Sequence, residues 1–276
     1  MVDQRGSYRY DSFAKDTQVE EFERLYRQSN TLLEIERQLW PGLGIASGQQ
    51  VLDLGCGSGI ITHELAKQVY PSEVTGLDLS KKLLARGRQA LFESDQGEFS
   101  QINATFQQGS VYQLPFHEES FDIVYARFVF QHLDEPMEAL SNIWRILKPG
   151  GLLCILDIDR NWSSLYPEPE TSLLLKQAIV DKQLSQGGDP WVGSKLGHYL
   201  KSSKFNQVQT TVRLIDSDQL GLAKYFEMLS FGGSYQSKQS KITTLQEKAR
   251  PDVKSLLDNP HAWAGFGLFV VTGRKS

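Results

Sequence analysis

Cysteine, basic charge and long apolar runs are all scarce in this sequence. Among its 276 residues are two cysteines, Cys56 and Cys154, which excludes a disulfide scaffold and fits a reducing cytoplasm. Lysine and arginine (29) do not exceed aspartate and glutamate (33), unlike in most nucleic-acid binders. No apolar run reaches the ~20 residues that span a bilayer, and the polar first residues lack the apolar core of a secretory signal. We therefore expect a soluble cytoplasmic protein that works with neither nucleic acid nor membrane.

Strands and helices are expected to alternate through the first two thirds of the chain. The short apolar runs that predict buried strands lie at 51–54, 73–78, 105–108, 121–127 and 152–158. Helical periodicity fills the gaps at 60–69, 80–92 and 136–147. Two further strands, at 208–215 and 264–272, bring the expected total to seven. Such alternation predicts an α/β fold with a doubly wound, mostly parallel, Rossmann-like sheet whose last strand is antiparallel.

Helical additions are expected around this sheet. Residues 1–44 are predicted to form an N-terminal helical cap segment, with a helix over 17–40 that Pro41 ends. The main domain is predicted at 45–276, with a helical insertion around 160–190 and a helical addition around 216–260. Aromatic residues in these additions are candidates for an apolar pocket wall, although most of them are better interpreted as core residues.

The most informative segment is residues 51–59, which read VLDLGCGSG. Glycines at 55, 57 and 59 follow a predicted strand and precede a predicted helix, which is where ligands bind in doubly wound sheets. Glycine adopts positive φ at no cost and lets a ligand approach the backbone closely. A nicotinamide-binding turn has a small residue at the sixth position, where this chain has Ile60. The spacing favours a ligand lying across the turn.

An acidic residue follows the second predicted strand. Asp78 lies about 20 residues past the glycine turn, where a carboxylate commonly binds the ribose hydroxyls of a nucleoside ligand. Its two acceptor oxygens match a vicinal diol. The alternative is that Asp78 only initiates the next helix beside Ser80.

Four segments in succession resemble the motifs of class I S-adenosylmethionine-dependent methyltransferases. They are residues 51–59, Asp78, residues 121–124 (FDIV) and residues 144–151 (WRILKPGG). The resemblance covers about residues 45–160 and extends to enzymes of the ubiquinone/menaquinone type. It implies that the chain is an enzyme, that S-adenosyl-L-methionine is its cofactor, and that its methyl acceptor is an oxygen, nitrogen or carbon atom of a small molecule.

The resemblance also assigns a set of residues to the cofactor. They are Asp53, Gly55, Cys56, Gly57, Asp78, Leu79, Ser110, Val111 and Arg127. The glycine turn holds the methionine part, and Asp53 either serves its amino group or bonds the N–H groups of the turn. Ser110 stands where the family commonly has an acid that meets adenine. Arg127 is expected to bind the cofactor carboxylate or an acidic substrate, or to form a surface ion pair.

The acceptor is expected to bind beside residues 126–133, ARFVFQHL. Gln131 and His132 in this segment, with Tyr8 and Tyr10 from the N-terminal segment, are the candidate substrate-binding residues. His132 is either a general base or a histidine bonded to backbone at a helix start. A base is not essential, because positioning against an activated sulfonium can supply about 7–11 kcal/mol.

Metal chemistry is not expected. Catechol-type methyltransferases have metal-binding acids after the fourth and fifth strands, and this chain lacks the first. Asp157 and Asp159 at the second place are expected to face solvent or substrate. Two other functions stay open, a nicotinamide-dependent oxidoreductase and a non-catalytic cofactor-binding protein. The oligomeric state is not determined by the sequence.

Overall fold

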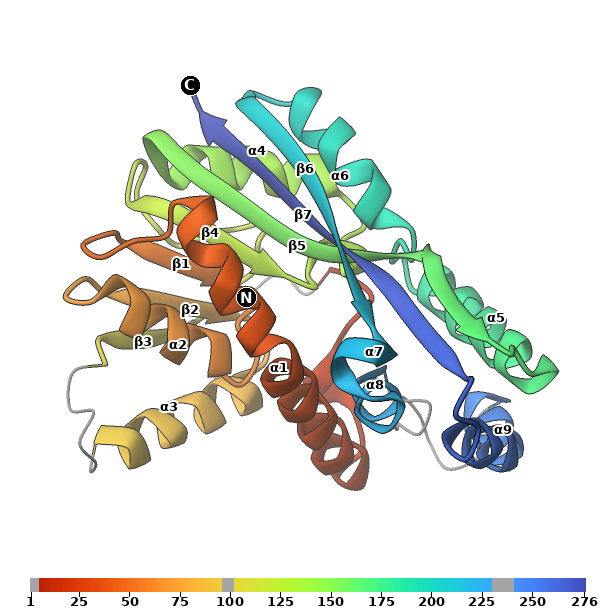
Figure 1. Ribbon diagram of the computed structural model, residues 1–276. Coiled ribbons are helices and arrows are strands. Elements are labelled where there is room, and N and C mark those ends of the chain that lie inside the picture. Colours follow the sequence, from red (N-terminus) through yellow and green to blue (C-terminus); the bar gives the residue numbers. More distant parts are fainter. Residues whose placement is uncertain (1–4, 96–101, 230–240) are drawn as a thin grey trace.

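A seven-stranded sheet runs through the part of the chain that the computed structural model describes, residues 5–95, 102–229 and 241–276 (Figure 1). Its order is β3-β2-β1-β4-β5-β7-β6. The strands are β1 (Val51–Leu54), β2 (Val74–Asp78), β3 (Ala104–Gln108), β4 (Phe121–Arg127), β5 (Leu147–Tyr166), β6 (Phe205–Asp216) and β7 (Trp263–Lys275). The first five strands pair in parallel, and β7 is antiparallel to both of its neighbours. The predicted α/β sheet is confirmed, including its antiparallel last strand.

Helices cover both faces of this sheet. They are α1 (Lys15–Leu43), α2 (Ile60–Val69), α3 (Lys81–Asp95), α4 (Pro136–Ile146), α5 (Glu170–Ser185), α6 (Val192–Lys201), α7 (Ser217–Leu220), α8 (Leu222–Leu229) and α9 (Lys241–Leu257), with short 3-10 turns η1 (Tyr10–Ser12) and η2 (Phe130–His132). Because successive strand residues point to opposite faces, Val51 and Ile123 enter the core beneath α1 and α2. Their neighbours Leu52 and Val124 enter the core beneath α4 and α6.

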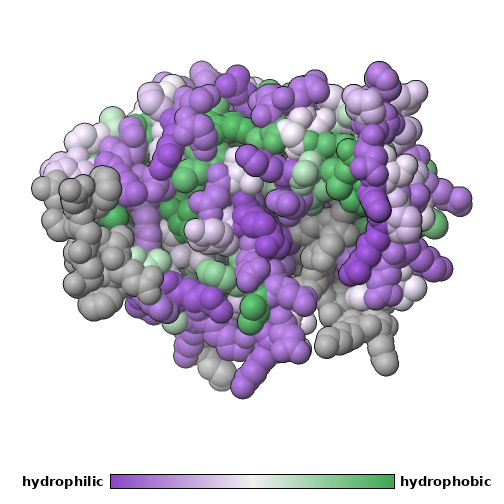
Figure 2. Space-filling view, turned by 60° about the horizontal axis from the view of Figure 1, so that its bottom comes forward, coloured by the Kyte–Doolittle hydropathy of each residue, from purple (hydrophilic) through white to green (hydrophobic). Residues whose placement is uncertain are grey.

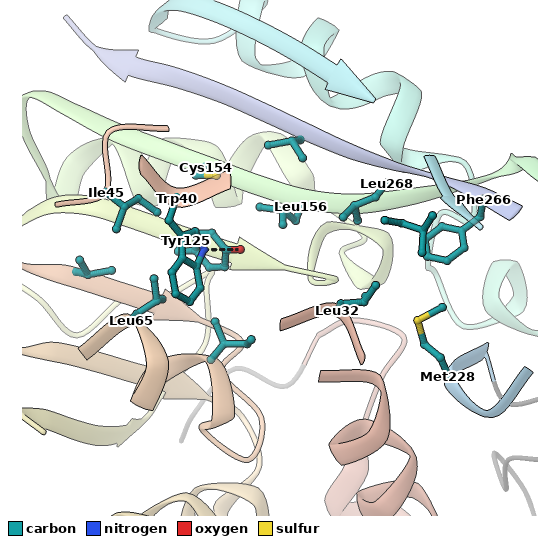
Figure 3. Packing of buried hydrophobic residues seen from close by; sticks show 14 of the residues in the cluster. Leu32, Trp40, Ile45, Leu65, Tyr125, Cys154, Leu156, Met228, Phe266 and Leu268 are labelled. Carbon is teal, nitrogen blue, oxygen red and sulfur yellow. Dashed lines mark hydrogen bonds between the residues drawn. The ribbon is translucent and has the colours of Figure 1, made fainter. Parts of the chain in front are cut away.

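Helix α1 belongs to the hydrophobic core. Leu32 and Trp40 are fully buried in the cluster that also contains Tyr125 of β4. Figure 3 shows Trp40 against Tyr125, where the indole Nε1 donates a hydrogen bond to the phenol oxygen at 3.4 Å. The C-terminal half of α1 therefore covers the sheet, whereas residues nearer its start line a cavity described below. The division of the chain at residues 44 and 45 stays a prediction.

The end of α1 differs from the expected stop at Pro41. The helix continues to Leu43, and Gly44 ends it with a left-handed φ of 82°. Proline removes only its own N–H group from the helix, so a proline in the last turn costs a single hydrogen bond there. The Gly44 N–H bonds the Pro41 carbonyl at 3.1 Å, which closes the helix at glycine.

Strand β5 extends well past the expected end at residue 158. Its partner β7 continues to pair with it from Ser163 to Tyr166, after an irregularity that follows Ile158. Backbone pairing across strands distant in sequence is invisible to local periodicity, so the expected helical insertion begins only at Glu170. In the predicted helical addition around 216–260, α7, α8 and α9 are present, and residues 230–240 lie outside the described residues.

The surface carries polar residues together with clusters of apolar residues. On the face that Figure 2 turns forward, hydrophilic residues predominate and hydrophobic residues gather in a band between them. Within the described residues, no helix is both long and apolar enough to cross a membrane.

Candidate active site

A cavity of about 300 Å³ lies at the carboxyl ends of β1, β2 and β4. The strand order reverses between β1 and β4, and such a switch point is the usual ligand site of a doubly wound sheet. Residues of the N-terminal segment, α1 and α5 complete the wall. The volume lies at the lower end of the range typical of small-molecule sites, which is roughly 300–1,000 Å³.

The glycine turn forms one wall of the cavity. Gly55, Gly57 and Gly59 all have positive φ, at 73°, 56° and 80°. A Cβ atom on Gly55 would lie 2.4 Å from Cγ2 of Val129, and one on Gly59 would lie 2.5 Å from the Phe106 ring. A Cβ on Gly57 would meet no atom within 4 Å. Packing therefore requires glycine at positions 55 and 59, whereas Gly57 leaves open space beside the turn.

Asp78 connects the turn to the end of β2. Its carboxylate accepts hydrogen bonds from the Gly57 N–H at 2.9 Å and the Ser80 N–H at 2.8 Å. The Ser80 hydroxyl accepts from the Leu83 N–H at 3.0 Å and so caps α3. Asp78 thus lines the cavity and also helps to initiate the helix, so the two predicted roles are compatible. Each carboxylate oxygen keeps capacity for a further donor.

Asp53 lies at the end of β1, behind the turn. Its side chain is buried and accepts a 2.6 Å hydrogen bond from the Thr62 hydroxyl. Burial raises the pKa of Asp53 to about 7. Its charge therefore changes close to neutral pH, and a cationic ligand group in the cavity would favour the ionised form.

Arg127 enters the cavity from the end of β4 as part of a buried network. Its Nε donates to Glu36 at 2.6 Å and its Nη1 to the Ser29 hydroxyl at 3.3 Å. Glu36 is fully buried and also accepts from the Tyr125 hydroxyl at 2.7 Å. The surface ion pair considered from the sequence is therefore wrong. The buried Arg127 Nη2 has no hydrogen-bond partner among the described residues, so its N–H groups can donate to a ligand.

The remaining residues assigned to the cofactor also reach the cavity. Leu79, Ser110 and Val111 line it, and Ser110 accepts a 3.2 Å hydrogen bond from the Tyr112 N–H. Burial, reinforced by two nearby carboxylates, raises the pKa of the Cys56 thiol well above its usual value. A protonated thiol is a poor nucleophile, so we interpret Cys56 as part of the wall that the turn forms.

The predicted acceptor residues meet around His132. His132 Nδ1 lies 2.9 Å from the Ser7 hydroxyl, and the Tyr8 ring lies 5.2 Å from the imidazole. Tyr8 donates to Glu21 at 2.8 Å, and Gln131 lines the same wall. Burial lowers the pKa of His132 to about 3. The imidazole is therefore neutral at neutral pH and a weaker base than the sequence-based hypothesis requires.

Tyr10 does not join this group. Its side chain is only 3% exposed, and its hydroxyl donates a 2.7 Å hydrogen bond to the Gln18 carbonyl. Among the described residues that line the cavity, Tyr8 is present and Tyr10 is not. The turn η1 directs Tyr10 against the start of α1, so its predicted contact with the substrate is wrong.

Asp157 and Asp159 were expected to face solvent or substrate, but they do not face solvent and are not among the described residues that line the cavity. Both are buried, at 0% and 2% exposure. The Asp157 carboxylate accepts from the backbone N–H groups of Gln131 and Ile158, and Asp159 accepts from that of Asn161. Within the described ranges, no three histidine, cysteine, aspartate or glutamate side chains gather as a metal site. Metal-free chemistry stays a prediction.

Sequence reasoning missed several charged residues of the site. They are Glu21, Arg24, Glu36, Arg160 and Lys182. Glu36 had a detectable signal, because it lies four residues from both Leu32 and Trp40 on the buried stripe of α1. Glu21 and Arg24 stand three residues apart and form a buried ion pair. Arg160 and Lys182 had no signal, since only the tertiary structure brings β5 and α5 to the cavity.

Comparisons with known proteins agree with this geometry. Residues 52–155 match a family model described as a methyltransferase domain. The chain is 36% identical over 159 residues to an uncharacterised methyltransferase of Schizosaccharomyces pombe, which covers 56% of each protein. It is 34% identical over 204 residues to a demethylmenaquinone methyltransferase of Lactobacillus johnsonii, covering 67% of this chain and 82% of that protein.

A solved structure shares the fold. A SAM-dependent methyltransferase from Methanosarcina mazei superposes with a TM-score of 0.53 at 17% identity, covering 82% of this chain and 92% of that one. At this identity the likeness concerns the fold alone. It places the seven-stranded sheet among known methyltransferase folds.

Proposed function

Because the chain belongs to the class I S-adenosylmethionine-dependent methyltransferases, we propose that it transfers a methyl group from S-adenosylmethionine to a small organic acceptor. S-adenosylmethionine is the cofactor of this family. The observation that carries the proposal is one cavity at the sheet's switch point, lined by the glycine turn, Asp78 and Arg127. The Lactobacillus johnsonii relative is named for a quinone precursor, which supports a small molecule as acceptor here.

The cavity residues fit the parts of this cofactor. Arg127 Nη2, the buried donor left over by Glu36 and Ser29, is assigned to the cofactor carboxylate. Asp53 is assigned to the ammonium group, and Asp78 to the ribose hydroxyls. The space beside Gly57 takes the methionine part, because no protein atom lies within 4 Å of the position a Cβ would occupy.

The adenine is assigned to the pocket end nearest β3. Leu79, Ser110 and Val111 line that end. The Ser110 hydroxyl and the Val111 N–H supply the polar contacts that an acid supplies elsewhere in the family. The apolar side chains of Leu79 and Val111 would supply the surface against which the ring binds.

Methyl transfer from this cofactor requires the protein to position the acceptor more than to act as an acid or a base. Bound S-adenosylmethionine supplies a methyl group activated by its sulfonium. Of residues 127–133, all except Phe130 line the cavity, and they would position the acceptor against that methyl group and exclude water. With its pKa near 3, His132 is assigned to shaping the acceptor site through its bond to Ser7, in place of proton abstraction. The oxygen, nitrogen or carbon identity of the acceptor atom stays open, and a cytoplasmic location stays a prediction.

Calorimetric titration with S-adenosylmethionine, S-adenosylhomocysteine and NADH tests the proposal. We expect binding of the first two in the micromolar range, roughly −8 kcal/mol. Asp78→Ala should abolish it. Asp122→Ala is the matched control, since Asp122 also accepts a backbone N–H, from Gln50 at 2.8 Å, but lies at the far end of its strand. Binding of NADH alone, or of none of the three, would refute the proposal.

The same purified protein can also be used to test the two alternative functions that the sequence left open. A nicotinamide oxidoreductase finds no support in the comparisons, and NADH binding is its test. A non-catalytic binding protein would bind the cofactor but leave it intact across a broad panel of acceptors. Formation of S-adenosylhomocysteine with any small-molecule acceptor would exclude that alternative.

A further inference from the structure

Helix α1 places a carboxylate behind the arginine that lines the cavity. Glu36 of α1 is fully buried, and one of its oxygens accepts a hydrogen bond from Arg127 Nε at 2.6 Å. The two residues are 91 positions apart in the chain. Among the described residues that line the cavity, Arg127 is present and Glu36 is not. Glu36 therefore lies behind Arg127 and does not itself reach the cavity.

Two side chains of α1 fix the orientation of the Arg127 guanidinium. Its Nε is bound by Glu36, and its Nη1 donates to the Ser29 hydroxyl at 3.3 Å. Ser29 and Glu36 lie about two turns apart on one face of the helix. A guanidinium is planar, so contacts to two of its nitrogens determine where the third one lies. That third nitrogen, Nη2, is buried and has no hydrogen-bond partner among the described residues.

The Glu36 carboxylate is itself held in place from the core. Its second oxygen accepts from the Tyr125 hydroxyl at 2.7 Å. That hydroxyl accepts in turn from the Trp40 indole Nε1 at 3.4 Å, the contact drawn in Figure 3. Burial raises the pKa of Tyr125 well above its usual value, so the phenol keeps the proton that it donates to Glu36. A continuous chain of contacts thus runs from the hydrophobic core to Arg127.

The stability of the fold does not by itself explain this arrangement. The side chains of Glu36 and Arg127 are 0% and 10% exposed. Taking a carboxylate and a guanidinium out of water costs free energy that their attraction only roughly offsets, so a buried ion pair contributes little net stability. What the pair does supply is a fixed direction for Arg127 Nη2, the nitrogen that stays available to a ligand.

We propose that Glu36 is a positioning residue for the cofactor, because it orients Arg127 so that Nη2 meets the carboxylate of the methionine part. This inference rests on the proposed methyltransferase function, which assigns Arg127 to that carboxylate. Hydrogen bonds weaken steeply when donor and acceptor are misaligned, so an Arg127 that is free to turn binds the carboxylate less well. The adenosine part is assigned to other residues, among them Asp78 and Val111, so its binding is independent of Glu36.

Calorimetry with two ligands tests this inference. S-adenosylhomocysteine carries the carboxylate, whereas 5′-methylthioadenosine has the same adenosine and sulfur without the amino acid. In Glu36→Leu we expect the Kd for S-adenosylhomocysteine to rise at least about tenfold and the Kd for 5′-methylthioadenosine to stay unchanged. Glu36→Gln should bind S-adenosylhomocysteine within about threefold of the unsubstituted protein, because its amide oxygen can still accept from Arg127 Nε. A purely structural role would weaken the binding of both ligands alike.

Glu64→Leu is the matched control, because Glu64 also pairs with an arginine, Arg37 of α1, but is not among the described residues that line the cavity. It should leave the ratio of the two Kd values unchanged. If Glu36→Leu does not fold, Tyr125→Phe takes its place. That variant removes the donor to the second Glu36 oxygen and should raise the Kd for S-adenosylhomocysteine alone, by about threefold.

Three results would overturn the inference. They are an unchanged ratio of the two Kd values in the variant that is tested, a loss in Glu36→Gln as large as in Glu36→Leu, and the same change of ratio in Glu64→Leu. The cofactor itself is tested separately. Failure of the unsubstituted protein to bind S-adenosylhomocysteine refutes the methyltransferase proposal, whereas binding that does not depend on Glu36 refutes only the role of this residue.

Discussion

Replacing Gly57 by alanine would separate the effect of backbone strain from the effect of an obstructed cofactor site. Gly57 has a φ of 56°, and a Cβ there would touch no atom within 4 Å. The fold therefore loses only the strain of a left-handed alanine, about 1 kcal/mol, or a melting temperature lower by roughly 2–4 °C. The added methyl group, however, occupies space that we assign to the methionine part of the cofactor. We expect the Kd for S-adenosylhomocysteine to rise at least about tenfold, or 1.4 kcal/mol.

Gly150→Ala is the control for this experiment. Gly150 has a φ of 75°, and a Cβ there would likewise meet nothing within 4 Å. It lies in the first part of β5 and is not among the described residues that line the cavity. Thermal melting should show a similar loss of stability in both variants, and calorimetry should show weakened binding in Gly57→Ala alone. Equal Kd values in the two variants would refute the assignment of Gly57 to the cofactor site.

Three further predictions concern charge, core and the corrected tyrosine. Below the Asp53 pKa of about 7 the carboxyl is neutral, so cofactor binding should weaken by up to about tenfold per pH unit as pH falls. Calorimetry across pH 6–8 measures this pH dependence of the Kd. The Asp53→Asn variant should lack it, and the same pH dependence in that variant would contradict the prediction. Leu32→Ala should lower the unfolding free energy in urea by about 2–5 kcal/mol, against less than about 0.5 for Leu257→Ala, whose side chain is 45% exposed. Tyr10→Phe should cost about 0.5–1.5 kcal/mol of stability and leave the acceptor KM unchanged; a raised KM would restore its substrate role.

Much of the fold was predictable because its signals are local. The strand β4 begins and ends where the apolar run predicts, at Phe121 and Arg127. Ser80 caps α3 through its own side chain, three residues from Leu83. The length of β5 was not predictable, since residues 163–166 are held in a strand by pairing with β7, about 100 residues later in the chain. Local periodicity carries no information on such a partner.

The sequence also predicted which residues of the β1 turn and of the end of β2 line the cavity, whereas for the N-terminal tyrosines its prediction was only half right. Asp53, Gly57 and Asp78 stand within one strand–turn–helix unit and its neighbouring strand, so their spacing reflects their geometry. Tyr8 and Tyr10 look alike in the sequence, yet one lines the cavity and the other bonds the backbone of α1. In an extended chain the two side chains would point the same way, but the 3-10 turn η1 begins at Tyr10 and turns its side chain toward α1.

The sequence by itself determined the alternating architecture, the glycine turn and the carboxylate at the end of β2. Each of these depends on residues close together in the chain, where spacing dictates which side chains meet. Only the tertiary structure decided that Glu36 neutralises Arg127 inside the core, and that Arg24, Arg160 and Lys182 share a wall. Those charges come from α1, β4, β5 and α5, and their meeting depends on how the helices pack on the sheet.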